Sequence, residues 1–220
     1  MAAFKPQFNS EFTEFESPDA GHQKSAKSAR AAESVRLALT ALALLSSITI
    51  LGTAGDTLSV FNNTHLGEDY FLPLWPSDFD LRPTVALVVC SVIVFVASAL
   101  SLTASKLPAV RNKALIHTSI SALAPAVCLI AGLIGTSFFY GVNSSNSVST
   151  LQSWSCQWSA VSMDTKPHWG TLCKESKAAL YLTVMLIPLE ALILGTVAFG
   201  AFVEKKQVII HERKGSPAMS

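Results

Sequence analysis

The sequence predicts an all-α membrane protein, built as a bundle of four transmembrane helices with both termini in the cytosol. Three observations predict this fold class. Four long apolar stretches divide the 220 residues, the basic residues gather in only some of the segments between them, and two cysteines share one loop. Half of the residues are hydrophobic and 14% are charged, against about 25% charged in soluble domains.

The apolar stretches cover residues 37–54, 85–104, 114–140 and 178–203. A helix needs roughly 20 mainly apolar residues to cross a bilayer. The last three stretches meet that length outright, and the first is near the lower limit. We therefore expect one membrane domain over residues 37–203, with polar tails over 1–36 and 204–220.

The distribution of charge predicts the orientation. Most of the 16 lysines and arginines lie in the two tails and in the short loop between the second and third stretches. Basic segments next to spans stay in the cytosol. The loops over 56–82 and 141–177 then face the outside or a lumen, as expected for a multi-pass protein of the plasma membrane or a secretory-pathway membrane.

The N-terminal tail carries an aromatic and a basic pattern. Phenylalanines recur at helical spacing and would share one helix face; these are Phe4, Phe8, Phe12 and Phe15. We expect a disordered tail, and the alternative is a short amphipathic segment that docks on a membrane or partner. The basic cluster of Lys24, Lys27 and Arg30 either holds the topology or binds anionic lipid, at about 1 kcal/mol per residue.

The first outer loop is acidic, aromatic and punctuated by prolines, so we expect a compact irregular loop. Trp75 is expected near the lipid headgroups, where tryptophan is enriched. Asn62 begins a glycosylation sequon on the outer side, and Asn143 begins a second one at the end of the third stretch. A glycoprotein is one expectation from these sequons.

The second outer loop contains Cys156 and Cys173. Because its compartment is oxidising, we expect a disulfide between them, the alternative being two free thiols. Trp154, Trp158 and Trp169 lie in or beside the loop that this bond would close. They either form an ordered recognition surface or anchor the loop to the lipid interface.

Glu190 lies near the middle of the fourth stretch, and His117 near the cytosolic end of the third. A carboxylate at that depth must be protonated, paired or facing water. Three roles remain open for Glu190. It bonds a serine hydroxyl such as Ser46, Ser47, Ser98 or Ser101, it handles a proton or cation, or it mediates self-association.

The sequence contains no CxxC, HExxH or phosphate-cradling glycine loop. Its five histidines are dispersed, which suggests no metal site. We therefore expect no enzyme activity, no cofactor and no nucleic-acid partner.

The layout over residues 37–203 resembles the tetraspan membrane proteins, namely MARVEL-domain proteins, the claudin and Sur7-like group, and tetraspanins. The resemblance is one of architecture: cytosolic tails, a short inner loop and an outer loop with a disulfide. It departs from claudins because the first outer loop has Trp75 but no cysteine, and from tetraspanins because Gln157 follows Cys156. No residue role is transferred.

Two functions are compatible with these features. The first is a non-enzymatic protein that organises or adapts other membrane components through lateral helix contacts and its outer loops. The alternative is a subunit of a small channel or transporter that uses Glu190. Expected partners are the lipid bilayer and other membrane proteins or further copies of this chain.

Overall fold

The computed structural model describes residues 18–65, 75–76, 78–107, 114–144, 149–161, 163 and 166–215. Its long helices are α1 (Pro18–Thr64), α2 (Arg82–Lys106), α4 (Ala114–Asn143) and α6 (Trp169–Gly215), joined at one end by the short helix α5 (Leu151–Gln157) and the strands β1 (Phe79–Asp80) and β2 (Ser149–Thr150). All four long helices are long and apolar enough to cross a membrane. This confirms the prediction of four long apolar helices, each able to span a membrane by its length and composition.

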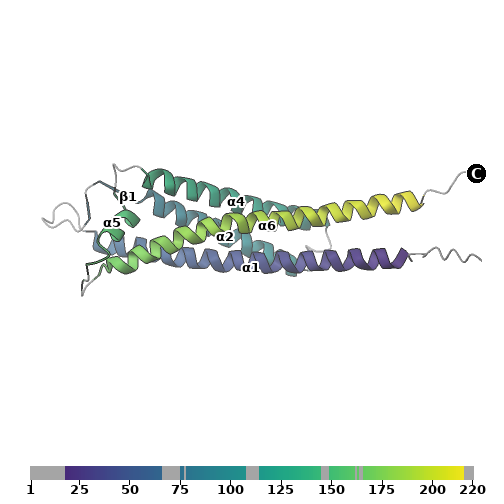
Figure 1. Ribbon diagram of the computed structural model, residues 1–220, viewed down its shortest axis with the longest axis horizontal. Helices are drawn as coiled ribbons and strands as arrows, with labels where there is room; N and C mark the ends of the chain where they lie inside the picture. The colour runs from purple at the N-terminus through teal and green to yellow at the C-terminus, as the bar shows by residue number, and fades with distance from the viewer. Residues whose placement is uncertain are drawn as a thin grey trace, which may run out of the picture.

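The long helices form an antiparallel bundle (Figure 1). α1 packs against α2 and α6, and α4 packs against the same two helices, so the ring runs α1, α2, α4, α6. Consecutive helices connected by short segments become antiparallel neighbours. Each helix therefore has two close neighbours and contributes one face to a shared interior.

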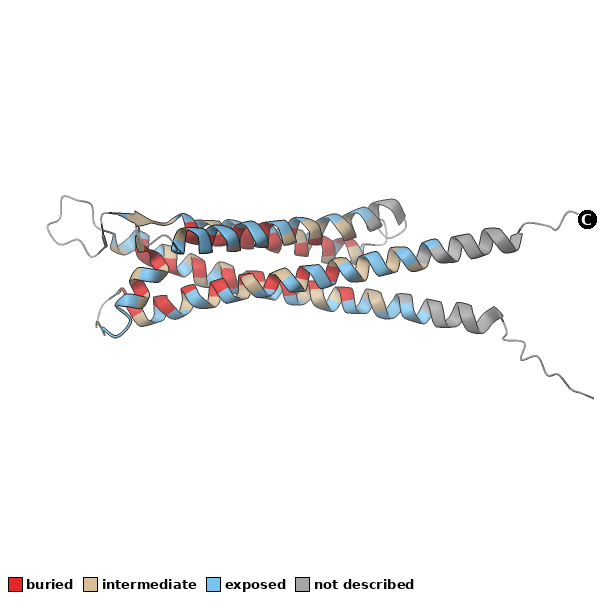
Figure 2. Cartoon of the chain, turned by 45° about the horizontal axis from the view of Figure 1, so that its top comes forward, coloured by how far each residue is buried: buried red, intermediate tan, exposed pale blue. Residues whose placement is uncertain are grey.

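Helices form here because a bilayer offers the backbone no hydrogen-bond partner, so each span must satisfy its own N–H and C=O groups. Buried residues concentrate on the faces turned toward neighbouring helices (Figure 2). The core of the bundle includes Ala43, Ile50, Leu87, Val94 and Phe139. Many large apolar side chains point away from it, among them Leu45, Leu123 and Phe202, as suits a lipid-facing surface.

Gly135 of α4 permits a close approach to α2. A Cβ atom at this position would lie 2.9 Å from the Cys90 Sγ atom, closer than side chains pack. Small residues at such crossings allow helix backbones to pack tightly in membranes.

Residues 18–36 were expected to belong to a disordered tail. In the structure they are helical and form the beginning of α1. This segment contains several Ala, Lys and Arg residues, which favour helix, and helix propagates readily from a preformed span. At the end that carries both termini, α1 and α6 extend past α2 and α4 (Figure 1). The four phenylalanines of residues 4–15 lie outside the described residues.

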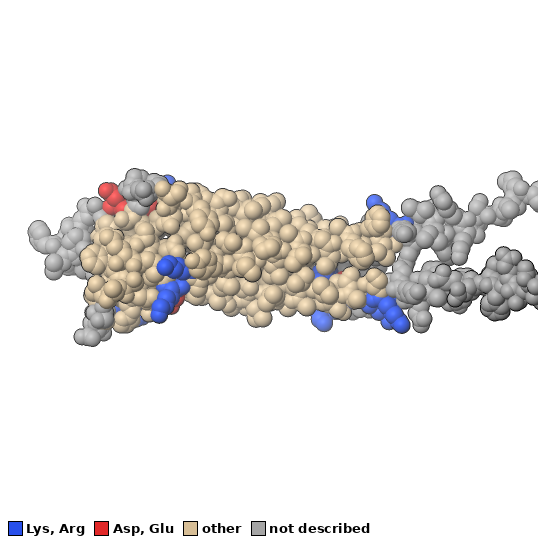
Figure 3. Space-filling view, viewed as in Figure 1, with Lys and Arg blue, Asp and Glu red and all other residues tan. Residues whose placement is uncertain are grey.

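Charged side chains on the face shown in Figure 3 lie toward the two ends of the bundle. A broad band without Lys, Arg, Asp or Glu separates the charges near α5 from those at the end that carries the termini. A band of this kind matches the hydrocarbon layer of a membrane.

Candidate functional site

The described parts of the two loops predicted to lie outside, within residues 56–82 and 141–177, come together at the end of the bundle remote from the termini (Figure 1). Strand β1 of the first loop pairs in parallel with β2 of the second, with Phe79 opposite Ser149. We call this unit the cap: residues 60–65, 75–76, 78–81, 149–161 and 169–173. Because strand pairing joins segments from both loops, the cap is shared between the two halves of the chain.

An aromatic cluster fills the cap. Trp75 contacts three aromatic rings, with centroid distances of 4.9 Å to Phe61, 5.2 Å to Phe79 and 5.0 Å to Trp169. Its Nε1 atom donates a hydrogen bond to the Thr64 Oγ1 atom at 3.1 Å. Trp75 is only 4% exposed. The Trp75 ring therefore packs against the ends of α1 and α6 and does not face outward as a lipid anchor. Its depth relative to the lipid headgroups stays a prediction.

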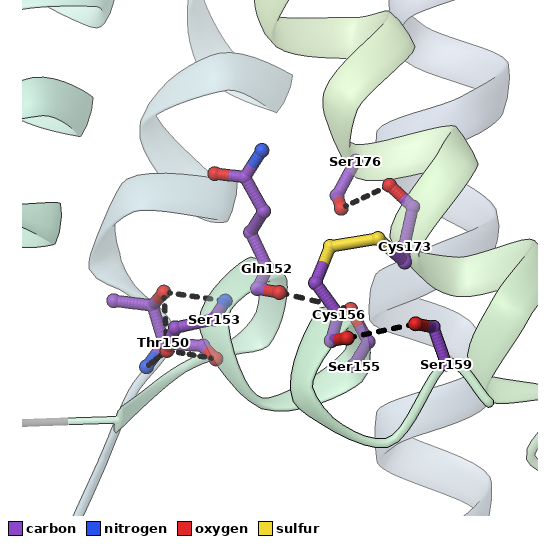
Figure 4. The surroundings of a disulfide bond; sticks show 8 residues. All are labelled: Thr150, Gln152, Ser153, Ser155, Cys156, Ser159, Cys173 and Ser176. Atoms are coloured by element: carbon purple, nitrogen blue, oxygen red, sulfur yellow. Dashed lines mark hydrogen bonds between the residues drawn. A yellow bond between two sulfur atoms is a disulfide. The ribbon is translucent and has the colours of Figure 1, made fainter. Parts of the chain in front are cut away.

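The disulfide between Cys156 and Cys173 is present, as predicted, with the two Cα atoms 4.7 Å apart. It joins α5 to α6 (Figure 4). Thr150 caps the first turn of α5, because its hydroxyl accepts a hydrogen bond from the Ser153 backbone N–H, and the Ser153 hydroxyl accepts one from the Thr150 N–H. This reciprocal capping box stabilises a helix of only seven residues.

The structure places the three tryptophans of the second loop in different surroundings. Trp169 is 4% exposed and belongs to the aromatic cluster, whereas Trp158 is 41% exposed. Trp154 has an intermediate exposure, and its ring centroid lies 5.7 Å from that of Trp158. Its Nε1 atom is buried without a hydrogen-bond partner among the described residues. A recognition role stays a prediction, and Trp158 is the ring best placed for it.

Both sequon asparagines are exposed. Asn62 lies in the last turn of α1, and Asn143 ends α4, where its Oδ1 atom accepts a hydrogen bond from Thr150 at 3.0 Å. Glycosylation of either residue stays a prediction.

The basic cluster and His117 lie toward the end of the bundle opposite the cap. Lys27 and Arg30 are exposed on α1. Lys24 lies in α1 and His117 in the first turn of α4, but their side chains fall outside the described part. Lipid binding by the cluster stays a prediction.

Below the cap, Glu175 of α6 meets Asp56 of α1. Burial and the negative charge of Asp56 together raise the pKa of Glu175 above its ordinary value of 4.5. The two residues lie just outside the apolar stretches, one after residue 54 and the other before residue 178. Sequence analysis missed this pair, although antiparallel packing of α1 and α6 brings these two ends together.

Glu175→Gln should stabilise the protein at neutral pH. A raised pKa means that the folded state binds more protons than the unfolded state. The stability of the wild type therefore falls as pH rises from the unfolded-state pKa to the raised folded-state pKa, and it stays low above that value. We expect the melting temperature of the variant in detergent to equal that of wild type near about pH 4, and to exceed it near about pH 7.5. Asp56→Asn should give a smaller gain, because burial, the largest cause of the raised pKa, still acts on Glu175. The double variant should gain little more than Glu175→Gln alone. A constant difference between variant and wild type at all pH values would contradict this account.

Glu190 lies at the centre of the bundle and is 2% exposed. It borders a small cavity whose walls come from all four long helices: Thr40, Ser98, Ser101, Ala124, Pro125, Cys128, Glu190 and Ile193. The cavity offers about 10 Å³ of room to the centre of a water-sized particle. Two of the four serines predicted near Glu190, Ser98 and Ser101, share this cavity with it.

The other two serines do not line the cavity. Ser46 and Ser47 each donate to backbone carbonyl groups of their own helix, at 2.9 Å to Leu42 and 2.7 Å to Leu44. The Glu190 Oε1 atom has no hydrogen-bond partner among the described residues. The sequence did not predict Thr40 and Cys128 as neighbours of Glu190, because the hydropathy of a span does not reveal its register against the other helices.

No group of three or more His, Cys, Asp or Glu side chains able to hold a metal ion occurs within the described ranges. In comparisons with known proteins, no family model, curated protein or solved structure matches this chain. The resemblance to MARVEL-domain, claudin and Sur7-like proteins stays a prediction from architecture.

Proposed function

We propose that this chain is a non-enzymatic membrane organiser or adaptor, acting in the plasma membrane or a secretory-pathway membrane. It holds other membrane proteins through its cap and through lateral contacts of its helices. The observation that carries this proposal is the ordered cap, built from both outer loops and closed by a disulfide. A preordered surface loses little entropy on binding, which favours recognition.

Trp158 is the proposed anchor of the cap. Its ring is 41% exposed and lies against that of Trp154. Trp158 directly follows α5, the short helix that the disulfide fixes to α6. Exposed tryptophans on rigid supports are frequent binding hot spots.

The surface of α6 supports lateral contacts. Ala191 and Gly195, one helical turn apart, are both exposed. A Cβ atom added at Gly195 would meet nothing within 4 Å. In membranes, such small-residue pairs let a second helix approach closely.

The channel alternative has less support. Glu190 faces the interior of a single chain at 2% exposure, so it does not present its side chain to a pore between copies. The cavity beside it has room for about one water molecule, too little for a hydrated path. The same burial weakens the idea that Glu190 mediates self-association.

Trp158→Ala should release the partner while the chain stays folded. If Trp158 is a hot spot worth about 2 kcal/mol or more, affinity falls about 30-fold or more. The measurement is chemical cross-linking in native membranes, followed by purification of the tagged chain. Tyr140→Ala is the matched control, since Tyr140 is also exposed but lies on α4 outside the cap. Equal cross-linking by wild type, Trp158→Ala and Tyr140→Ala would contradict recognition through the cap.

A further inference from the structure

Four residues that line the cavity at the bundle centre carry side-chain oxygen atoms, and one of them is an unsatisfied carboxyl group; the other lining residues are Ala124, Pro125, Cys128 and Ile193. The Glu190 Oε1 atom is buried without a partner among the described residues, and the Glu190 side chain lines the cavity. Hydroxyl-bearing side chains from two other helices, Thr40 of α1 and Ser98 and Ser101 of α2, line the same space. A buried polar atom without a partner is destabilising unless something outside the chain satisfies it.

The charge of the cavity selects the kind of occupant. Glu190 is the one ionisable acid among its lining residues, and none of them is basic. The buried Arg36 lies one turn before Thr40, but its guanidinium pairs with Glu33 at 2.6 Å. An unpaired carboxylate in this surrounding is costly, and one positive charge neutralises it. A divalent ion would leave one positive charge uncompensated in the same low dielectric.

The ligand atoms and the size of the cavity narrow the choice further. The Thr40 hydroxyl donates its proton to the Arg36 carbonyl oxygen at 2.8 Å, which leaves the lone pairs of Oγ1 as acceptors. Carboxylate and hydroxyl oxygens are hard donors and suit hard cations rather than soft metals. Room for about one water-sized particle fits a small dehydrated cation better than a large one.

We propose that this cavity is a binding site for one Na⁺ ion, held by the Glu190 carboxylate and the hydroxyls of Thr40, Ser98 and Ser101. The ion neutralises Glu190 and links α1, α2 and α6, so it stabilises the bundle. The ion stays bound and is not transported, because the cavity has room for one water-sized particle and offers no path through the bundle. The proposal goes beyond the organiser function and does not depend on any partner.

The test is the melting temperature of the purified chain in detergent, titrated with NaCl against choline chloride at constant ionic strength. Mass action predicts a rise with the logarithm of the Na⁺ concentration, of about 3–6 °C when Na⁺ is ten times its dissociation constant. Glu190→Gln should abolish the Na⁺ dependence. Ser101→Ala, a milder change that keeps the bundle packed, should weaken the apparent affinity for Na⁺ about tenfold.

Ser46→Ala is the matched control, because Ser46 is also a serine within a span but its hydroxyl bonds to Leu42 outside the cavity. It should titrate with Na⁺ like wild type. A melting temperature that is the same in NaCl and choline chloride would overturn the proposal and assign the cavity to a water molecule beside a protonated Glu190. Na⁺ dependence that persists unchanged in Ser101→Ala and Glu190→Gln would overturn it as well.

Discussion

Trp75→Ala should unfold the cap. Trp75 is 4% exposed and is the ring that contacts Phe61, Phe79 and Trp169 together. Truncation leaves a large cavity between the ends of α1 and α6 and removes the hydrogen bond to Thr64. Loss of a buried tryptophan costs about 3–5 kcal/mol. For a unit the size of the cap, that is enough to populate the open state.

Hydrogen exchange followed by mass spectrometry measures this directly. Backbone amides of α5 and β2 should exchange more than ~100-fold faster in Trp75→Ala than in wild type. Trp158→Ala provides the control, since the same residue type is removed from an exposed position and should change stability by no more than about 0.5 kcal/mol. If the two variants exchanged at similar rates, the aromatic cluster would not be what holds the cap together.

Removal of the disulfide should produce the second large effect. Cys156 and Cys173 are 17 residues apart, and the bond joins α5 to α6. In the chain-entropy model, a closed loop of this length contributes about 3 kcal/mol by restricting the unfolded state. The double variant Cys156→Ser, Cys173→Ser should lose about that much, and α5 should lose its protection from hydrogen exchange before the long helices do.

A reducing agent provides the control for this prediction. Wild type treated with reductant should behave like the double variant, whereas the double variant should not respond to reductant. The free cysteines Cys90 and Cys128 are buried in the bundle and contribute no bond. Equal stability of oxidised wild type and the double variant would show that the cap holds α5 without the covalent bond.

The sequence was most informative where one physical constraint dominates. The four spans could be predicted because a bilayer demands long uncharged runs, and residues 178–203 satisfy that demand regardless of their neighbours. The disulfide between Cys156 and Cys173 followed from their shared loop. Neither inference required knowledge of which helix packs against which.

Features that depend on contact between distant segments were not predictable. Strands β1 and β2 have two residues each, too few for an alternating pattern. Trp75 was expected to be an interfacial anchor. The residues around it in the sequence are the same whether the loop meets lipid or folds inward, so they could not show that its ring is buried. Thr40 joins Glu190 only through the rotation of α1 against α6. Helix α1 begins at Pro18 because helix propagates from the span into the preceding segment. The polar composition of that segment gave no sign of this extension.

The central claim is that the chain acts by holding other membrane proteins rather than by moving ions. The most direct measurement is native mass spectrometry of the tagged chain, extracted with its surrounding lipid from its own membrane. The account predicts a complex whose mass equals this chain plus a distinct protein, reduced to the chain alone by Trp158→Ala. Recovery of wild type only as a single chain, or only as copies of itself, would contradict the claim.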